Sequence, residues 1–537
     1  MTLLRRKFVL IAGLSAAVYL LIFSLPYPLS QHYSKIPPVD YAKLSEYSVL
    51  GFVSFLAGLA LAFALYLWAL RLITRASGGA ARAVISLRFV LLTGALLAAV
   101  LLLSYPLGAI DVFVYAIYTR GWALHGLNPL ATAPAQYPAG DPWLGLAAEW
   151  IAAPSPYGPV WQLLSLGAYY AGGGDFLLQV YALKILAILA YLGCTILIYR
   201  ILQHTRSDWA LAGAIAFAWN PLVLIEVAQN AHNDIVMIFF MLAAVWALTA
   251  ARRTSPGTSG SVRSLPVGHA ANSPGVEARP AAGMKKPLLY DGLVCLFLAL
   301  SILTKFITIV VAPFFLLALM MHGQRWPDRF ARLIGFGLLI GALVVIGTWP
   351  LWPGWENWAV VQGADSAGRS ILALVVLTLR DALQVDAAFD VARRVLLGVY
   401  VLIYGCALWR LAQLIWRSTS DRGAAIIQQT LASSFLALFW LLLLVMPIFH
   451  AWYVLWCLPL AVLLLPRRRP LYAAIVFSIT ALFIIPYFET IRVWFPELLR
   501  NPLLGHLIGV TVLTVPPILT LLWPRKSTLT LDARLED

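Results

Sequence analysis

The sequence predicts an all-α fold, a polytopic bundle of transmembrane helices, from its composition and from the length of its apolar runs. Hydrophobic residues make up 61% of the 537 positions and charged residues only 11%, and the mean hydropathy is +0.85. A water-soluble fold with this composition would expose a very large apolar surface, so the bilayer has to be the solvent.

Apolar runs that can cross the membrane recur along the whole chain. A spanning helix needs about 20 mainly apolar residues, and by that measure we predict about fourteen spans. They are 8–25, 48–70, 86–105, 176–201, 209–227, 235–251, 288–304, 306–321, 333–349, 395–416, 430–447, 453–465, 471–487 and 504–523. The first follows Arg5, Arg6 and Lys7 and lacks a small-residue cleavage site, so we expect a retained signal anchor and a cytoplasmic N-terminus.

One shorter apolar stretch, Val160 to Gly172, decides the orientation of everything after it. If it crossed the membrane, the basic residues of the next loops would lie outside, against the positive-inside bias. If it lies in the interface, every basic loop becomes cytoplasmic, namely 71–88, 200–206, 252–286, 325–332, 417–422, 467–469 and 525–526. We therefore predict an interfacial segment within one large external region, 105–175, and a multi-pass plasma-membrane protein with both termini cytoplasmic.

The net charge of +15 has the same explanation, since the Lys and Arg residues lie mostly in these short loops. We expect membrane lipid as a partner and no nucleic acid. Residues 254–287 are rich in Ser, Gly and Pro, so we predict a disordered cytoplasmic linker between two membrane halves, 1–253 and 288–537. The four cysteines lie in apolar runs without CxxC spacing and indicate neither disulfides nor a thiolate metal site.

The external region carries the first candidate for chemistry. Asp111 follows the third predicted span within a few residues, where a carboxylate held at a helix end can face water and act as a general base. The alternative is a helix cap, because Asp is a favoured capping residue. Arg120, Asn128 in Gly-Leu-Asn-Pro, and Tyr157 in Pro-Tyr-Gly-Pro follow in the same region; alone, such residues anchor a protein in the headgroup layer.

A second polar patch lies at the external end of the fifth and sixth predicted spans, with Asn220-Pro221, Glu226 and then Gln229-Asn230-Ala231-His232-Asn233-Asp234. Its amides, imidazole and carboxylates can make directional hydrogen bonds to several hydroxyls at once. A metal site is less favoured, because no second His lies at helical spacing. A plain polar turn is the alternative.

Two further patches lie at predicted external tips. Lys305 lies where two apolar runs meet with almost no loop, and it either snorkels to lipid phosphate or binds the phosphate of a lipid-linked substrate. His450-Ala-Trp452-Tyr453 follows Pro447, and His450 can donate to a phosphate or a sugar. A histidine in the interfacial aromatic belt is the plainer interpretation of that patch.

Together these patches resemble the membrane glycosyltransferases of the C superfamily, which transfer a sugar from a polyprenyl-phosphate carrier on the extracytoplasmic side. The resemblance is greatest to bacterial polyprenyl-phosphomannose-dependent alpha-mannosyltransferases. It rests on the order and external placement of Asp111, 126–129, 156–159, 220–221 with 232–234, and 450–453. The chain departs from the simplest pattern in having two extra predicted spans before the external region and no Asp-x-Asp pair within it.

The resemblance implies a general base in the first large external loop, which here is Asp111, with Asp141 and Glu149 as alternatives. It implies a polyprenyl-phosphate sugar donor, with mannose as the expected sugar, a glycan or glycolipid acceptor, and an inverting single displacement. No cofactor is expected, although a divalent metal stays open. The substrate-binding residues would be Arg120, Asn128, Tyr157, His232, Asn233, Asp234, Lys305, His450, Trp452 and Tyr453.

Two other functions fit parts of the pattern. A transporter or flippase for a lipid-linked sugar would also have many spans, but the chain has no inverted sequence repeat and few ionisable residues deep within spans, Lys184 being the main exception. A non-catalytic partner in an envelope assembly complex would leave Asp111 dispensable.

Overall fold

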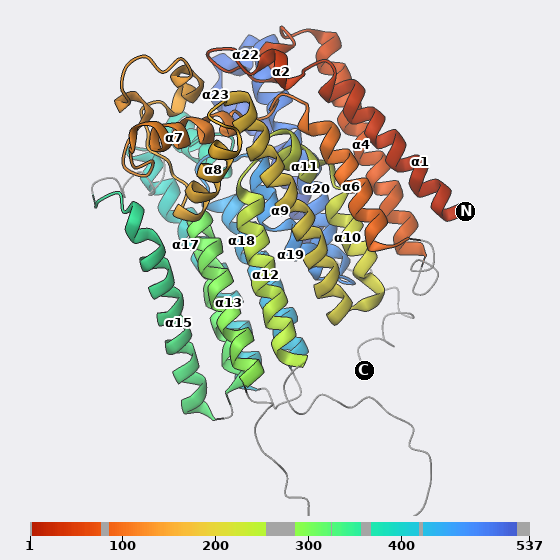
Figure 1. Ribbon diagram of the computed structural model, residues 1–537, viewed down its shortest axis with the longest axis vertical. Coiled ribbons are helices and arrows are strands. Elements are labelled where there is room, and N and C mark those ends of the chain that lie inside the picture. The colour runs from red at the N-terminus through yellow and green to blue at the C-terminus, as the bar shows by residue number, and fades with distance from the viewer. Residues whose placement is uncertain are drawn as a thin grey trace, which may run out of the picture.

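The chain folds into long helices that run side by side, with shorter helices gathered at one end (Figure 1). The computed structural model describes residues 3–76, 85–253, 285–323, 325–355, 367–417 and 423–523. Within these ranges every regular element is a helix, and strand-like pairing is limited to two isolated bridges. The predicted all-α polytopic fold is confirmed.

The long helices and their short continuations follow one another as the apolar runs do. They are α1 (Leu3–Val18) with η1 (Tyr19–Ser24), α4 (Val49–Arg75), α6 (Leu87–Leu102), α9 (Phe176–Thr205), α10 (Ala210–Ala218), α11 (Pro221–Leu224) with η5 (Ile225–Gln229), α12 (Asp234–Arg253), α13 (Lys285–Thr304), α14 (Ala312–Leu319), α15 (Trp326–Thr348), α17 (Ala388–Trp416), α18 (Gly423–Leu444), α19 (Leu458–Leu463), α20 (Arg468–Leu482) and α23 (Pro502–Leu522).

Nine helical segments of the described ranges are long and apolar enough to cross a membrane. A tenth is the pair 207–218 and 221–229, bent by 52° where Asn220-Pro221 interrupts the helix, because proline cannot donate the next backbone hydrogen bond. Four shorter apolar helices, Leu87–Leu102, Leu288–Thr304, Ala312–His322 and Ala451–Leu463, coincide with other predicted spans. Every predicted span therefore matches a helix, while the count of about fourteen crossings stays a prediction.

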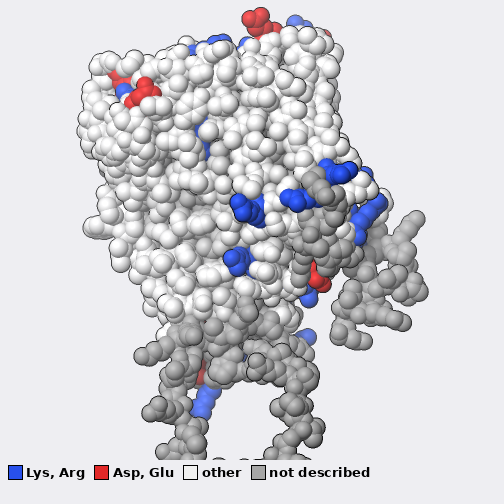
Figure 2. Space-filling view, turned by 45° about the vertical axis from the view of Figure 1, so that its right-hand side comes forward, with Lys and Arg blue, Asp and Glu red and all other residues white. Residues whose placement is uncertain are grey.

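The predicted external region contains α7 (Asp111–His125), η2 (Pro134–Gln136), η3 (Leu144–Trp150) and α8 (Pro159–Ala171). Figure 1 shows α7 and α8 at the end of the bundle that also carries α2 (Leu29–His32) and α22 (Pro496–Arg500). The thirteen residues of α8 extend about 20 Å, less than the hydrocarbon thickness, and α8 is not among the candidate spans. Figure 2 shows that Lys and Arg on the face in view gather mostly on the opposite, lower half.

Burial separates the central helices from the peripheral ones. In α12, 78% of the span's apolar window is buried inside the protein, against 6% in α15, so α12 is central and α15 faces lipid. Helix α12 packs against α9 and α13, and η12 (Ala451–Trp456) contacts its end. The predicted linker falls largely on residues 254–284, which lie outside the described residues; α13 already begins at Lys285.

Candidate active site

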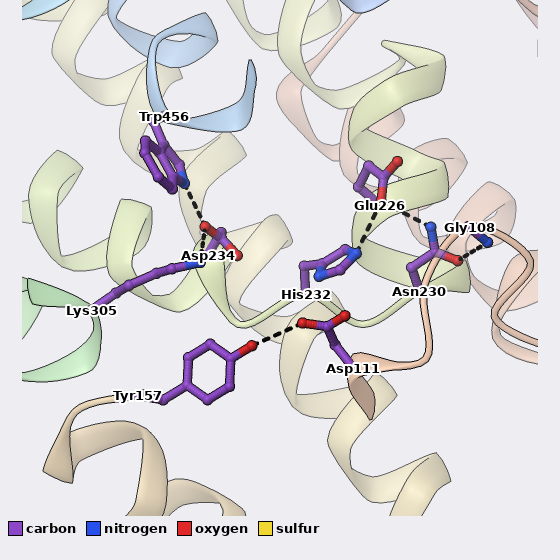
Figure 3. Close-up of polar contacts among 9 residues, drawn as sticks. All are labelled: Gly108, Asp111, Tyr157, Glu226, Asn230, His232, Asp234, Lys305 and Trp456. Atoms are coloured by element: carbon purple, nitrogen blue, oxygen red, sulfur yellow. Dashed lines mark hydrogen bonds and ion pairs between the residues drawn. The ribbon is translucent and has the colours of Figure 1, made fainter. Parts of the chain in front are cut away.

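Asp111 is the first residue of α7. The capping position belongs to Ile110, and no side chain caps this end of the helix. Instead, Asp111 Oδ1 accepts a hydrogen bond from the Tyr157 hydroxyl at 2.8 Å, and Asp111 stays partly exposed (Figure 3). The capping alternative is therefore wrong. A carboxylate that is anchored to a helix end and reached by solvent has the placement that a general base needs.

Tyr157 comes from the Pro-Tyr-Gly-Pro turn that leads into α8. Its ring lies edge to face against Tyr115, one helical turn after Asp111, with 5.0 Å between the ring centroids. Burial, and next the Asp111 carboxylate, raise the pKa of the Tyr157 hydroxyl well above its usual value. Tyr157 therefore stays protonated at physiological pH and acts as a donor to Asp111.

Gly158 sets this turn against the end of α13. Its N–H donates to the Thr304 carbonyl at 3.1 Å, and a Cβ atom at this position would lie only 2.0 Å from the Leu303 carbonyl oxygen. Only glycine permits this close approach. The approach brings the Tyr157 ring under Lys305, whose Nζ lies 5.6 Å from the ring centroid.

Lys305 lies between α13 and η6 (Phe306–Val310) and pairs with the first residue of α12. Its Nζ is 2.8 Å from Asp234 Oδ1, and the indole N–H of Trp456 in η12 donates to the same oxygen. Nζ also lies 5.4 Å from the ring centroids of both Tyr453 and Trp456. Asp234 is fully buried, while the Lys305 side chain is 17% exposed. A buried carboxylate is thus compensated by a cation that still reaches the surface.

The turn between η5 and α12 is strained at Ala231, whose φ of +58° is a left-handed conformation that costs a non-glycine residue about 1 to 2 kcal/mol. This turn directs two side chains at Glu226, whose Oε2 accepts from Asn230 Nδ2 at 2.8 Å and lies 3.2 Å from His232 Nε2. Asn230 Oδ1 accepts from the backbone N–H of Gly108 at 3.3 Å (Figure 3). The turn is thereby tied to the loop that ends at α7.

His232 belongs to a stack of three rings. The Trp452 ring is parallel to the imidazole of His232, with centroids 3.9 Å apart, and to that of His450, with centroids 4.3 Å apart. Two imidazoles cannot both lie so near the centre of one face, so they cover opposite faces of Trp452. Burial, and next the cation Arg369, hold the pKa of His450 well below its usual value. Trp452 therefore fixes two imidazoles and has no free face for a sugar.

Several buried polar atoms of this group have no hydrogen-bond partner among the described residues. All belong to side chains that are at most 1% exposed. Because buried polar atoms in folded proteins are almost always paired, a cluster of unpaired ones indicates a place for a polar ligand. The atoms are both amide atoms of Asn233, Asp234 Oδ2, Glu226 Oε1, both ring nitrogens of His232 and the Tyr115 hydroxyl.

Two residues predicted to bind substrate lie elsewhere. Arg120 is about 13 Å along α7 from Asp111 and pairs with Asp141 at 3.1 Å, with its other nitrogen 3.4 Å from the Gly174 carbonyl. Asn128 donates to the Leu351 carbonyl at 3.2 Å. Arg120 holds the external region together, Asn128 ties it to the segment that follows α15, and neither residue contacts Asp111 in the described part of the chain.

The two alternatives to Asp111 are also placed away from the group. Asp141 forms an ion pair with Arg120 and accepts a hydrogen bond from the backbone N–H of Trp143 at 2.9 Å. Glu149 is exposed at the end of η3. Neither carboxylate has the contact with Tyr157 that distinguishes Asp111, so Asp111 stays the favoured base.

Sequence reasoning missed two residues of the group and left two without a role. Trp456 could have been found from its helical spacing after Tyr453, and Tyr115 from its position four residues after Asp111. Glu226 and Asn230 were noticed as polar but not assigned. Among the described residues, no group of three or more His, Cys, Asp or Glu side chains could hold a metal ion.

Comparison with known proteins identifies a mannosyltransferase family for this chain. A family model described as "Alpha-(1->6)-mannopyranosyltransferase, N-terminal domain" matches residues 10–321, more than half of the chain. No curated protein matches.

Two solved structures of an oligosaccharyltransferase from Archaeoglobus fulgidus are similar at a TM-score of 0.36. One is in complex with an inhibitory peptide and a dolichol-phosphate and is 12% identical; the other is in the apo form and is 11% identical. The match covers 81% of this chain and 55% of theirs.

Proposed function

The chain belongs to the alpha-(1→6)-mannopyranosyltransferase family, and from that premise we propose that it transfers mannose from a polyprenyl-phosphate donor to a mannoside acceptor on the extracytoplasmic face. The observation that carries this proposal is the contact of the partly exposed Asp111 with Tyr157, beside the buried Asp234–Lys305 pair. This observation supports the proposal because Tyr157 contacts both a partly exposed carboxylate and, 5.6 Å from its ring centroid, the ammonium of Lys305.

The proposed reaction is an inverting single displacement. Asp111 takes the proton of the acceptor hydroxyl while the acceptor oxygen attacks the anomeric carbon. The bond between that carbon and the phosphate oxygen breaks, and Lys305 stabilises the charge on the leaving phosphate. Lys305 can do this while paired with Asp234, because an ammonium has three N–H donors. Asn233, Asp234 and Tyr115 supply unpaired polar atoms for sugar hydroxyls.

The test is a transfer assay with the purified full-length protein, polyprenyl-phosphomannose and an α-mannoside acceptor. Nucleotide-activated mannose replaces the lipid donor in a parallel arm. We expect product from the lipid donor only, and a loss of about 100-fold or more in Asp111→Asn, the usual contribution of a positioned base. Glu149→Gln is the matched control, because it neutralises an exposed carboxylate of the same region. An active Asp111→Asn variant would contradict the proposed base.

A flippase for a lipid-linked sugar is the second candidate, because the bent pair 207–218 and 221–229 resembles the discontinuous helices of transporters and leads into the buried polar turn. The same assay separates the two functions. A flippase leaves the sugar on its lipid, so labelled mannose would stay in the lipid fraction instead of passing to the water-soluble acceptor.

A further inference from the structure

We propose that Arg369 and Arg492, which lie against the same aromatic ring, form a second anion site that binds the phosphate of the polyprenyl phosphate released by transfer. This inference rests on the proposed function and adds a binding site for its lipid product. It starts from two arginines that the displacement itself does not use.

The two guanidinium groups meet at the buried ring of Phe488, which is 5% exposed. The ring centroid lies 5.7 Å from the guanidinium carbon of Arg369 and 5.1 Å from that of Arg492. Both distances are within the range of a cation–π contact, about 6 Å. Arg369 precedes α16 (Ile371–Leu377), whereas Arg492 is the first residue of α21 (Arg492–Trp494). Two distant segments of the chain thus place two positive charges at one ring.

One carboxylate accompanies the two arginines. Glu489 forms an ion pair with Arg369, and both side chains are about one-third exposed. Arg492, in contrast, forms neither an ion pair nor a side-chain hydrogen bond with any described residue, and its Nε is a buried atom without a partner. A guanidinium is always charged and has five N–H donors. The group therefore has a net charge of +1 and unused donors, which is the condition for binding an anion.

The backbone around this group departs from regular geometry on both sides. Arg369 has a φ of +56°, a left-handed conformation that is unfavourable for a residue with a Cβ atom. Phe488 and Glu489 lie in the π-helical turn η13 (Pro486–Ile491), which leads directly into α21. Strained residues and π-helical turns occur preferentially at functional sites. Both observations therefore favour a binding role for the two arginines over a purely structural one.

The group adjoins the candidate active site through two backbone contacts. The N–H of Gly368 donates to the Pro447 carbonyl at 2.9 Å, and the Gly368 carbonyl accepts from the N–H of Phe449 at 3.1 Å. These bonds pair the segment that carries Arg369 with the segment that leads into His450. Arg369 is thereby held beside the aromatic residues of the candidate active site.

Tyr453 connects this region with Lys305, the cation proposed to meet the leaving phosphate. The Tyr453 ring centroid lies 5.3 Å from that of the His450 ring and 5.4 Å from Lys305 Nζ. His450 and Tyr453 thus separate two groups of cations at one end of the bundle. The reacting phosphate belongs at Lys305, next to Tyr157 and Asp111, so a phosphate at the arginines is one that has already left the sugar.

The chemistry of the product fits two guanidinium groups. The donor is a phosphodiester with one negative charge. Transfer breaks the bond between its phosphate oxygen and the anomeric carbon, and the electron pair stays on that oxygen. The product is a phosphate monoester, which carries about 1.5 to 2 negative charges at pH 7. Because arginine presents its N–H donors in a planar fork that matches phosphate, a pair of arginines favours the monoester.

The test is the binding of radiolabelled polyprenyl phosphate to the full-length protein in nanodiscs of neutral phosphatidylcholine, without donor or acceptor. Arg492→Gln should weaken binding about tenfold or more, the scale of losing one charge-assisted hydrogen bond. The double variant Arg369→Gln/Glu489→Gln removes the other guanidinium without leaving a carboxylate unpaired, and it should weaken binding to a similar extent. It provides an independent measurement should Arg492→Gln fail to fold. Wild-type affinity in either folded variant overturns the inference.

The matched control is Arg500→Gln, which removes an exposed arginine of α22 at the same end of the bundle. It should bind as the wild type does, whereas an equal loss in Arg500→Gln and Arg492→Gln would mean that only the general surface charge attracts the lipid. A second arm adds phosphatidylglycerol to the nanodiscs. This phosphodiester should displace little polyprenyl phosphate, and displacement at equal concentration would assign the arginines to lipid headgroups instead.

A further double variant separates this inference from the proposed function. Lys305→Gln/Asp234→Asn removes the first cation without leaving a buried carboxylate unpaired, so it should lose transfer but still bind polyprenyl phosphate within threefold of the wild type. A complete loss of binding would place the product at Lys305 and overturn the second site. A wild type that binds polyprenyl phosphate through the arginines but transfers no sugar would overturn the proposed function and leave the anion site in place.

Discussion

Two buried carboxylates on neighbouring helices, Asp234 and Asp291, are satisfied in very different ways. Helices α12 and α13 pack together, and the pairing of Lys305 after the end of α13 with the first residue of α12 shows that they run antiparallel. Asp234, at one end, shares Oδ1 between Lys305 and Trp456 and leaves Oδ2 unpaired. Asp291, near the other end, has Oδ1 2.9 Å from His322 and Oδ2 2.8 Å from Arg332.

The difference separates a structural contact from a site. Both carboxylates are fully buried, so each needs compensation for the loss of water. Asp291 has a partner on each oxygen and fastens α13 to α15 and to η7 (Met320–His322). Asp234 Oδ2 has no hydrogen-bond partner among the described residues, and the amide of the adjacent Asn233 is also unpaired. A carboxylate with a partner on each oxygen has no free acceptor for a ligand, whereas a carboxylate with one unpaired oxygen has one.

The largest expected effect comes from exchanging each carboxylate for an amide. Asp234→Asn should reduce kcat/KM for transfer about 100-fold, the scale of losing one placed polar group in a site, and should also lower the unfolding temperature, because it breaks the buried pair with Lys305. Asp291→Asn also breaks a buried ion pair, at a cost of about 3 kcal/mol, but should leave the kcat/KM of the folded protein unchanged. Both are measured by transfer kinetics and thermal unfolding in the same detergent. Equal losses of activity in the two variants would remove the distinction.

A smaller effect is expected at Gly158, which joins the external region to the end of α13. Gly158→Ala should lower transfer by tenfold or more, on the order of the loss from a roughly 1 Å displacement of catalytic groups, because the new Cβ would push Tyr157 away from Lys305. Gly167→Ala, in the helix α8 that Gly158 precedes, is the control, since nothing lies within 4 Å of its Cβ position. Unchanged kinetics in Gly158→Ala would mean that the turn adapts without moving the site.

The smallest effect is expected for Tyr157→Phe, which removes only the hydroxyl that donates to Asp111. One neutral donor contributes about 1 kcal/mol, so transfer should fall by about fivefold. The raised pKa of Tyr157 keeps its proton in place as pH rises, so the wild-type rate should show no loss from ionisation of this group up to about pH 10. A pH–rate profile of both proteins checks this. An alkaline loss in the wild type that is absent from Tyr157→Phe would contradict the assignment of Tyr157 as a permanent donor.

Much of the fold could be predicted because the length of an apolar run is a local property of the sequence. Each predicted span matches a helix, and the short stretch at 160–172 forms the thirteen-residue α8. Asp111 was also identified from position alone, as a carboxylate next to a helix end. The capping alternative failed because the helix begins one residue earlier than a cap would require. That single residue decides whether the carboxylate binds backbone or faces the site.

Charge pairing could not be predicted, because it depends on which loops meet. Arg120 was expected to bind substrate, yet the fold brings Asp141 to it. Trp452 was expected to border a sugar, but both its faces carry imidazoles. In each case the residue type indicated a polar or aromatic contact, but the sequence did not indicate which residue would be the partner. A contact between two loops depends on the tertiary fold and is not specified by the local sequence.

The sequence by itself determined that this protein is a membrane protein and roughly where its long apolar helices lie. These follow from the length and polarity of local segments in a solvent about 30 Å thick. Only the tertiary structure decided that Lys305 meets Asp234 across 71 residues, and that Trp456 reaches the same oxygen across 222. Packing of antiparallel helices brings distant segments to one end of the bundle, and there it leaves Asp234 with an oxygen that no group of the described residues binds.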